Sequence, residues 1–385
     1  MIQFYFYFCD MSKLPNSSTS IFSVMSQLAK EHNAINLAQG FPNFPVENRL
    51  LKTVNELLYH DVHQYSHSAG SPNLLQAIEN LTLKKYGRKV NRETEIVVTA
   101  GATQGIYTAI QALIHYHDEV IVLDPCYDSY EPSIIMAGGK PVHVDLNSDY
   151  LPDFNAIEKA ITSKTKMLII NNPHNPSGRI WTEKDFEALE TILEKHPQII
   201  LLSDEVYEYI SFSQPHISCN SREKLVHKTI VVSSFGKSLH ITGWKIGYLI
   251  APPTILNEIK KVHQFVVFSV NSLAQETVGA YLNETDFDEV KNMYQRKKEN
   301  FRNILENTNF KLLPCDGTYF QVVDYSEISN QNDVDFAKEL TIQHGVAAIP
   351  ISVFYQNKTD LKRLRFCFAK TEQTLVMAGE RLKKI

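Results

Sequence analysis

Residues 229–248 read TIVVSSFGKSLHITGWKIGY, and the interpretation of the whole chain depends on this stretch. Its first residues, Thr229 to Val232, form a β-branched run that is typical of a buried strand. The Gly236-Lys237-Ser238 step that follows looks like the end of a phosphate-binding P-loop. That motif requires a second glycine five residues before Gly236, and the sequence has Val231 there. The P-loop interpretation is therefore rejected, and Lys237 is left as a lysine at the end of a strand.

Short apolar runs like this one recur along the chain, and each ends in polar or glycine residues. Continuous Ile, Val and Leu runs are typical of strands that are buried on both faces of a mostly parallel sheet. Helical patterns lie between several of them. One begins at Ser71-Pro72 and is stopped by Gly87, and another is capped by Thr182 with Asp185. This alternation predicts an α/β fold. The apolar runs are residues 95–101, 119–125, 167–173, 199–205, 229–237 and 246–252.

The length of 385 residues suggests two domains, and a composition of 43% hydrophobic and 21% charged residues is that of a globular protein. After about residue 283 a long charged helix precedes short strands, which predicts a smaller α+β domain. Chain termini often lie together, so the N-terminal segment is expected to join it. We predict a leader over 1–15 (disorder is one reading, with Met11 as an alternative start), a segment of the small domain over 16–48, a large domain over 49–282 and a small C-terminal domain over 283–385.

Charge and cysteine content exclude several classes of protein. The net charge of −5 and the pI near 6.3 argue against a nucleic-acid partner. The five cysteines form no CxxC pair and their number is odd, which favours the reducing cytoplasm. No apolar run is long enough for a membrane span. His63 and His67 have i,i+4 spacing but no third ligand, so no metal site is expected. The basic cluster 84–89 is interpreted as a solvated helix end.

The residues after each apolar run are the candidates for a site, because ligands of open α/β sheets bind at the carboxyl ends of the strands. Small residues from Gly101 to Gly105 open a helix, either as an anion site or as a plain turn. The turn NNPHNPSG over 171–178 either presents an amide or is simply a loop. Asp204 at a buried strand end needs a cation or several donors, unless it caps a helix. Tyr207 lies three residues later and can point to the same side.

Lys237 and Lys245 complete this set. A lysine at a strand end, inside the crevice of the sheet, has its pKa lowered by burial and by a nearby cation, and the neutral amine forms Schiff bases. One lysine can be the nucleophile and the other a phosphate partner. Together the strand ends supply an anion-binding turn, an acid, a phenol, an amide and two lysines. Pyridoxal phosphate needs this set of groups.

At this point the sequence resembles the fold-type I pyridoxal-phosphate aminotransferases of class I, across about residues 20–380. It is most similar to the branch of methionine, kynurenine and glutamine–phenylpyruvate aminotransferases. Each matching motif is weak alone, but their order and spacing are specific. The resemblance implies a large domain with a mostly parallel, seven-stranded type of sheet flanked by helices, and a smaller α+β domain built from both termini. The motifs are NLAQGFPNFP (36–45), AGATQGIY, DPCYDSYEP, NNPHNPSG, SDEVYEYI, SSFGKSLHITGWKIGY and LRFCFAK.

The resemblance also implies roles for single residues. Lys237 would carry the cofactor as a Schiff base and serve as general base, and Asp204 would pair with the pyridinium nitrogen. Arg365 would grip the substrate carboxylate bidentately, helped by Asn175 and the backbone near Gly40. Tyr65 would reach the phosphate of the neighbouring subunit, in a homodimer with shared active sites. The other cofactor contacts implied are Asn175 and Tyr207 at the ring hydroxyl, Tyr127 stacked on the ring, and Ala102, Thr103, Ser234 and Lys245 at the phosphate.

The implied reaction moves the amino group of an L-amino acid to a 2-oxo acid by a ping-pong Schiff-base mechanism. Lysine at position 245 departs from the arginine of aspartate-type enzymes, and no second arginine for a dicarboxylate is evident. Phe22 and Phe268 either line the substrate pocket or are core residues. If they line it, they favour bulky apolar or aromatic substrates such as methionine, phenylalanine, kynurenine or glutamine.

Two rival functions remain open to a chain with these residues. A cysteine-S-conjugate β-lyase is the alternative enzyme, because elimination can use the same lysine base. A non-enzymatic regulator that binds pyridoxal phosphate is disfavoured, because the chain has no length left for a DNA-reading module and keeps the Lys237–Asp204 pair.

Overall fold

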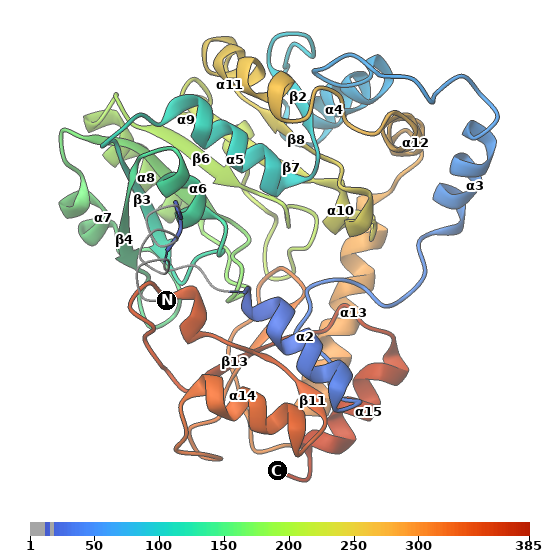
Figure 1. Cartoon of the computed structure of the whole chain (residues 1–385), viewed down its shortest axis with the longest axis vertical. Coiled ribbons are helices and arrows are strands. Elements are labelled where there is room, and N and C mark those ends of the chain that lie inside the picture. The colour runs from blue at the N-terminus through green and yellow to red at the C-terminus, as the bar shows by residue number, and fades with distance from the viewer. Residues whose placement is uncertain (1–11, 16–18) are drawn as a thin grey trace, which may run out of the picture.

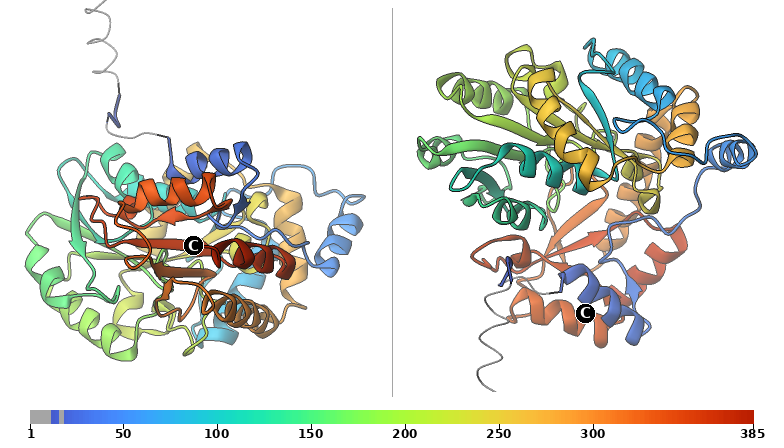
Figure 2. Two further views of the ribbon diagram at one scale, coloured as in Figure 1. Left: turned by 90° about the horizontal axis from the view of Figure 1, so that it is seen from below. Right: turned by 45° about the horizontal axis from the view of Figure 1, so that its top comes forward.

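The computed structural model describes residues 12–15 and 19–385, and most of the predicted leader over 1–15 lies outside them. Figure 1 shows a large layer of sheet and helices above a smaller part that contains both the blue N-terminal helix and the red C-terminal helices. The two further views in Figure 2 show the same two-part arrangement. Among the described residues, no helix is both long enough and apolar enough to cross a bilayer.

A seven-stranded sheet forms the centre of the large part, as expected. Its order is β2-β8-β7-β6-β5-β3-β4. β8 runs antiparallel to both of its neighbours, and the other pairs are parallel. All strands except β8 therefore end at the same edge of the sheet. The strands are β2 (Ile96–Thr99), β3 (Glu119–Asp124), β4 (Lys140–Asp145), β5 (Thr165–Asn171), β6 (Ile200–Asp204), β7 (Thr229–Ser234) and β8 (Gly247–Ile250).

Two hydrophobic cores cover the two faces of this sheet. Alternate residues of a strand belong to different cores: Val97 packs in one, and Ile96 and Val98 pack in the other. Helices α5 (Ala102–Leu113), α6 (Tyr130–Met136) and α11 (Pro253–Val266) cover the first face. Helices α4 (Pro72–Tyr86), α8 (Glu183–Lys195) and α12 (Ser272–Leu282) cover the second. Burial on both faces explains why the strands read as unbroken apolar runs.

Both predicted helix-start signals are confirmed. The Ser71 hydroxyl accepts a hydrogen bond from the Leu74 backbone nitrogen, and Gly87 ends α4 in the left-handed region at φ 69°. Thr182 and Asp185 form a capping box at the start of α8. The remaining helical segments of the large part are α3 (Asn48–Leu57), α7 (Phe154–Ala160), α9 (Glu223–Val226) and α10 (Phe235–Ser238), with 3₁₀ turns at Cys219–Ser221 and Thr242–Trp244.

The smaller part combines both ends of the chain. Helix α2 (Ile21–Glu31) contacts α14 (Asp333–Ile342), and β1 (Ile35–Asn36) pairs with β11 (Val346–Ala347). A four-stranded antiparallel sheet has the order β12-β13-β10-β9. The domain boundaries themselves remain a prediction. The other elements here are α13 (Phe287–Leu305), β9 (Lys311–Leu312), β10 (Phe320–Asp324), β12 (Ile349–Pro350), a 3₁₀ turn at Ser352–Phe354, β13 (Arg363–Cys367) and α15 (Glu372–Leu382).

The structure corrects one expectation and, in the large sheet, adds one strand to the six predicted apolar runs. Lys85 is not a solvated residue at a helix end: its ammonium lies 3.4 Å from Glu208 Oε2 and over the ring of Tyr209. The strand β4 was not anticipated, because its alternating sequence includes the exposed Lys140 and Asp145 and it lies at the edge of the sheet.

Candidate active site

A cavity of about 170 Å³ lies where β2, β5, β6 and β7 end. Residues from separate motifs of the sequence meet at its wall, because parallel strands deliver their carboxyl ends to one edge. The predicted site residues that line it are Ala102, Thr103, Tyr127, Asn175, Asp204, Tyr207, Ser234, Lys237 and Lys245. Gly40, Phe22 and Arg365 contact these residues or lie beside them, as described below.

Lys237 lies in the single turn α10, directly after β7. Its ammonium is 3.5 Å from the Gly40 carbonyl oxygen and 5.9 Å from the ring centroids of Tyr207 and Tyr319. Burial lowers the pKa of Lys237 to about 8, opposed by neighbouring groups that include Asp204. A larger share of this amine is therefore neutral near pH 7 than of an ordinary lysine, which suits a nucleophile or a base.

Asp204 ends β6 and is 4% exposed. The Tyr130 hydroxyl donates to Asp204 Oδ2 at 2.6 Å, and the Val206 backbone nitrogen donates to Oδ1 at 3.3 Å. Burial raises the pKa of Asp204 to about 6, although these hydrogen bonds lower it. This buried carboxylate has no cation in contact with it among the described residues, so a protonated ring nitrogen would be a suitable partner.

Tyr130 is a site residue that the sequence analysis missed. It opens α6 three residues after Tyr127, and the two rings meet edge to face at 5.7 Å. The i,i+3 spacing within CYDSY was the available signal, because residues at that spacing share one face of a helical turn.

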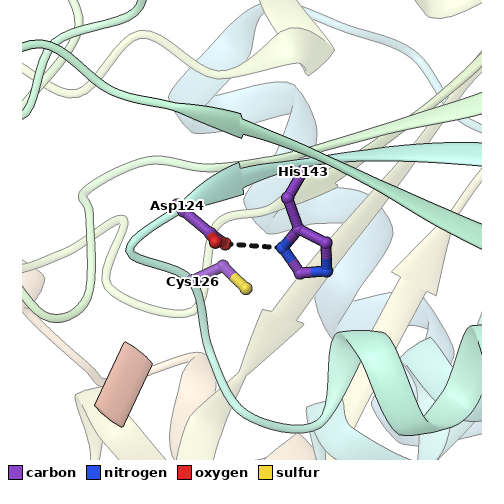
Figure 3. Close-up of side chains that lie close together, drawn as sticks. All are labelled: Asp124, Cys126 and His143. Carbon is purple, nitrogen blue, oxygen red and sulfur yellow. Dashed lines mark hydrogen bonds and ion pairs between the residues drawn. The ribbon is translucent and has the colours of Figure 1, made fainter. Parts of the chain in front are cut away.

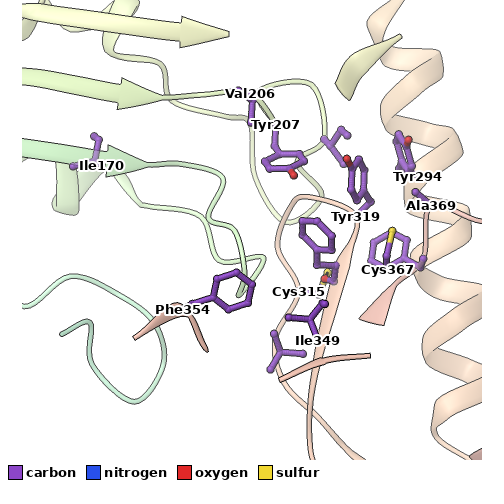
Figure 4. Packing of buried hydrophobic residues seen from close by; sticks show 14 of the residues in the cluster. Ile170, Val206, Tyr207, Tyr294, Cys315, Tyr319, Ile349, Phe354, Cys367 and Ala369 are labelled. Atoms are coloured by element: carbon purple, nitrogen blue, oxygen red, sulfur yellow. Dashed lines mark hydrogen bonds between the residues drawn. The ribbon is translucent and has the colours of Figure 1, made fainter. Parts of the chain in front are cut away.

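Tyr207 and the turn after β5 form the side of the cavity toward the small part. Tyr207 packs edge to face against Tyr319 with ring centroids 5.2 Å apart, and Figure 4 shows this pair with Tyr294 and Cys367 beyond it. The Asn175 backbone nitrogen donates to Asn171 Oδ1 at 2.7 Å, which fixes the turn. The Asn175 side chain is then free to accept from another part of the chain.

Arg365 supplies that donor from β13. Its Nη1 donates to Asn175 Oδ1 at 2.7 Å, and its Nη2 donates to the Ala38 carbonyl at 3.1 Å. The residue is 1% exposed, and its Nε has no hydrogen-bond partner in the described chain. Three aromatic rings surround the guanidinium carbon: Phe320 at 3.9 Å, Phe22 at 5.3 Å and Phe354 at 5.4 Å. A buried guanidinium with only neutral partners and a free donor suits a carboxylate ligand.

The other end of the cavity is an anion cradle. Helix α5 starts there after Gly101 at φ 79°, and no side chain caps its first turn. A Cβ at Gly101 would lie 3.0 Å from Lys245 Nζ, and one at Gly247 would lie 2.8 Å from the Ala102 backbone nitrogen. Because these two positions are glycines, the first turn of α5 can lie close to both Lys245 and β8. Free backbone N–H groups beside an ammonium fit a phosphate, and Thr103 Oγ1 lies 3.3 Å from the Tyr127 hydroxyl at its rim.

Two predicted residues lie apart from this cavity. Tyr65 is 81% exposed and Phe268 is 54% exposed, and their rings meet edge to face at 5.1 Å. Phe268 therefore does not lie beside Phe22, which packs near Phe354 at the guanidinium of Arg365. Within one chain, only Phe22 of the two predicted pocket aromatics belongs to the site.

A separate group of polar side chains lies where β3 ends beside β4. Figure 3 shows Asp124, Cys126 and His143, whose ligand atoms lie within 4.8 Å of one another. His143 Nδ1 is 2.9 Å from Asp124 Oδ1, and the Gln356 backbone nitrogen donates to Oδ2 at 2.8 Å. Each carboxylate oxygen thus has its own donor, so hydrogen bonding accounts for the arrangement and we assign no metal to it.

Comparison with known proteins agrees with this geometry. The family model of the class I and II aminotransferases matches residues 32–382. A methionine aminotransferase of Escherichia coli is 42% identical, over 97% of this chain and 98% of its own. A kynurenine–oxoglutarate transaminase of Dictyostelium discoideum is 33% identical, over 95% and 94% of the two chains.

Solved structures give the same result. A structure from E. coli described as a methionine aminotransferase matches with a TM-score of 0.95 at 42% identity, covering 97% of this chain and 99% of its own. An aspartate aminotransferase of Thermus thermophilus matches with a TM-score of 0.88 at 26% identity, covering 97% and 98%. The chain belongs to the class I and II aminotransferases, and it is a transaminase.

Proposed function

We propose that this transaminase acts on methionine and on other bulky apolar or aromatic L-amino acids, with a 2-oxo acid as acceptor. The observation that carries the proposal is the state of Arg365. Among the described residues, its buried guanidinium is hydrogen-bonded only to neutral oxygens, its Nε has no partner, and three aromatic rings surround it. An α-carboxylate would satisfy the cation, and the rings would leave an apolar place for the side chain.

The cofactor we propose is pyridoxal phosphate, which members of this family use. When bound, it serves as a sink for the electrons of the bond broken at the amino-acid α-carbon. The donor set fits it: an anion cradle at α5 and Lys245, a carboxylate at Asp204, and an amine at Lys237. Lys237 would bind the aldehyde and later move the α-proton, while Asp204 would hold the ring nitrogen protonated. Asn175 and Tyr207 would donate to the ring oxygen, and Tyr127 would pack on the ring.

The preference for an apolar side chain rests on the aromatic rings and on the relatives. The ring centroids of Phe22 and Phe354 lie 5.3 and 5.4 Å from the guanidinium carbon of Arg365, where they would border a bound carboxylate. The relatives at 42% and 33% identity are named for methionine and kynurenine, and both of these amino acids are large. A second carboxylate would have to be desolvated among these rings, which is costly.

A panel of amino donors with a common 2-oxo acid acceptor tests the proposal. We expect kcat/KM for methionine and phenylalanine to exceed that for aspartate by at least about tenfold, equivalent to ~1.4 kcal/mol of transition-state binding. A ranking with aspartate first would overturn it. Release of pyruvate and ammonia from cysteine S-conjugates, without an acceptor, would favour the β-lyase alternative instead.

We further propose that the enzyme works as a homodimer in the cytoplasm. Its described cysteines are free and buried, which suits a reducing compartment. Tyr65 and Phe268 lie exposed together, so a second copy could both cover them and receive Tyr65 at its phosphate cradle.

A further inference from the structure

Four consecutive backbone carbonyls lie beside Lys237 and Arg365, at what we call the mouth of the site, and each accepts a hydrogen bond from a cation. Arg365 Nη2 donates to the Ala38 carbonyl at 3.1 Å. Lys370 Nζ donates to the Gln39 carbonyl at 3.2 Å and to the Phe41 carbonyl at 2.8 Å. Lys237 Nζ lies 3.5 Å from the Gly40 carbonyl. We call residues 38–41 the carbonyl segment.

The other polar groups of the carbonyl segment are also occupied. The Tyr319 hydroxyl donates to the Gly40 carbonyl at 2.7 Å. Asn36 Oδ1 accepts from the backbone nitrogens of Ala38 and Gln39 at 3.0 and 3.1 Å. The segment is therefore fixed in one conformation by its hydrogen bonds.

Two of the three cations have other tasks in the proposed reaction. A carboxylate ligand is a stronger acceptor for the Arg365 guanidinium than the neutral Ala38 carbonyl. Lys237 would bind the cofactor, and its ammonium is then no longer available to the Gly40 carbonyl. In the proposed loaded site the Gly40 contact would be lost, and the Ala38 contact would compete with the carboxylate for the Arg365 guanidinium.

Lys370 has no such second task. It is 3% exposed, it follows β13, and it does not line the cavity. Within the described chain it forms no ion pair, and its ammonium hydrogen-bonds to the Gln39 and Phe41 carbonyls alone. A buried ammonium is costly, so its hydrogen bonds to carbonyls must be retained. Figure 4 shows Ala369, the residue before it, beside Tyr294 and Cys367.

We propose that Lys370 is a positioning residue for the amino-acid substrate. It keeps the carbonyl segment at the mouth of the site while Lys237 and Arg365 are engaged by the cofactor and the substrate carboxylate. In this role Lys370 touches neither ligand. It holds the Gln39 and Phe41 carbonyls, and through them it fixes Gly40, whose backbone lies next to Lys237.

A second contact holds the adjoining residues in the same way. Asn43 Oδ1 accepts from the Thr371 backbone nitrogen at 2.6 Å, and Asn43 Nδ2 donates to Thr374 Oγ1 at 2.9 Å. Residues 370–374 thus anchor residues 39–43 at both ends of the loop. Asn43 is exposed, so its side chain can be removed without burying an unpaired group.

The test compares Lys370→Met with Lys297→Met in the full-length holoenzyme. Lys297 donates to the Lys370 carbonyl at 2.8 Å and lies over the ring of Phe44, but it touches none of the four carbonyls. Lys370→Met should raise KM for L-methionine about tenfold with kcat changed less than about threefold, the loss expected of a charged hydrogen bond that binds rather than reacts. Lys297→Met should leave KM within about twofold, and Lys370→Arg should recover part of the loss.

Hydrogen exchange of the 36–45 region gives a readout independent of activity. We expect faster amide exchange there in Lys370→Met, with the remaining regions unchanged. Asn43→Ala should shift KM and amide exchange in the same direction by a smaller factor. This variant replaces Lys370→Met in the test if Lys370→Met fails to fold. Unchanged KM and exchange in Lys370→Met, or in Asn43→Ala where that variant stands in, would overturn the proposal. So would equal changes in kcat and KM.

The kinetic part of this test rests on the proposed function, and the exchange part does not. If the wild-type enzyme turns over no amino donor of this class, the proposed function fails. Faster local exchange in Lys370→Met would then still support the anchoring of the segment by Lys370.

Discussion

At Lys237 and Asp204 one physical cause changes two pKa values in opposite directions. Burial disfavours the charged form of each side chain, so it lowers the pKa of the amine to about 8 and raises that of the carboxyl to about 6. The amine is thereby brought toward the neutral form that reacts. The carboxylate is left in need of a cation, which the proposed cofactor would supply.

Burying the ionised Asp204 carboxylate is unfavourable, and this predicts that the stability of the cofactor-free protein depends on pH. Its pKa rises from 3.8 in an unfolded chain to about 6. The folded state therefore binds the extra proton between these values, and the stabilisation present below pH 3.8 is lost as the pH rises through about 6. A pKa difference is worth ~1.4 kcal/mol per unit, so the free energy of unfolding of wild type should fall by about 3 kcal/mol across this window, relative to that of Asp204→Asn.

Urea unfolding of the two cofactor-free proteins at several pH values between 4 and 7, roughly the window set by these pKa values, measures this difference. Because asparagine does not titrate, the variant lacks this contribution to the slope of unfolding free energy against pH. Equal slopes in both proteins would contradict the assignment of a raised pKa to Asp204.

At the scale of elements, the close approach of β8 to the start of α5 decides how the anion cradle is built. A Cβ at Gly247 would meet the Ala102 nitrogen and the Ser233 oxygen at 2.8 Å, and these are backbone atoms that cannot move aside alone. Gly243, four residues earlier, has no atom within 4 Å of such a Cβ. Gly243 therefore provides a matched control for a substitution at Gly247.

We predict that Gly247→Ala weakens the binding of pyridoxal phosphate by at least about tenfold, or ~1.4 kcal/mol, because α5 must shift from the cradle. Gly243→Ala should stay within about twofold, since an added methyl group meets open space there. Titration of each cofactor-free variant with pyridoxal phosphate, followed by absorbance, measures both constants. Similar affinities in the two variants would argue against the cradle.

The same elements mark what the sequence could predict. Buried strands and capped helices carry their signal locally, so β5, β6, β7, α4 and α8 were predicted within a few residues. The strand-end rule then brought Asp204 and Lys237 together without knowledge of the structure. Tyr130 was missed although its spacing from Tyr127 was a local signal, because its acceptor Asp204 lies 74 positions further along the chain. Lys370 was missed because its partners, the Gln39 and Phe41 carbonyls, lie near the other end of the chain. Local patterns say nothing about such partners.

At the scale of the whole molecule, an exposed aromatic surface predicts the dimer. Tyr65 is 81% exposed and lies beside Phe268, and Phe265, three positions before Phe268 in the chain, is 86% exposed. Apolar groups gathered in this way are a usual sign of an interface. We expect wild type to sediment at twice its chain mass of 44.0 kDa.

Phe265→Glu should shift the protein toward the monomer and lower its activity, because Tyr65 would no longer reach a neighbouring site. Tyr116, which is 76% exposed at the far edge of the sheet, provides the control Tyr116→Glu, and this variant should remain dimeric. Analytical ultracentrifugation with activity assays measures both. A fully active wild-type monomer would contradict the shared site.

The contacts of the carbonyl segment also bear on biosynthesis. Ala38 and Arg365 are separated by 327 positions, and Gln39 and Lys370 by 331. A ribosome releases the first residue of each pair long before the second is translated. The last strand of the seven-stranded sheet ends at Ile250, so every strand of that sheet is translated before Arg365 and Lys370, which hold the carbonyl segment.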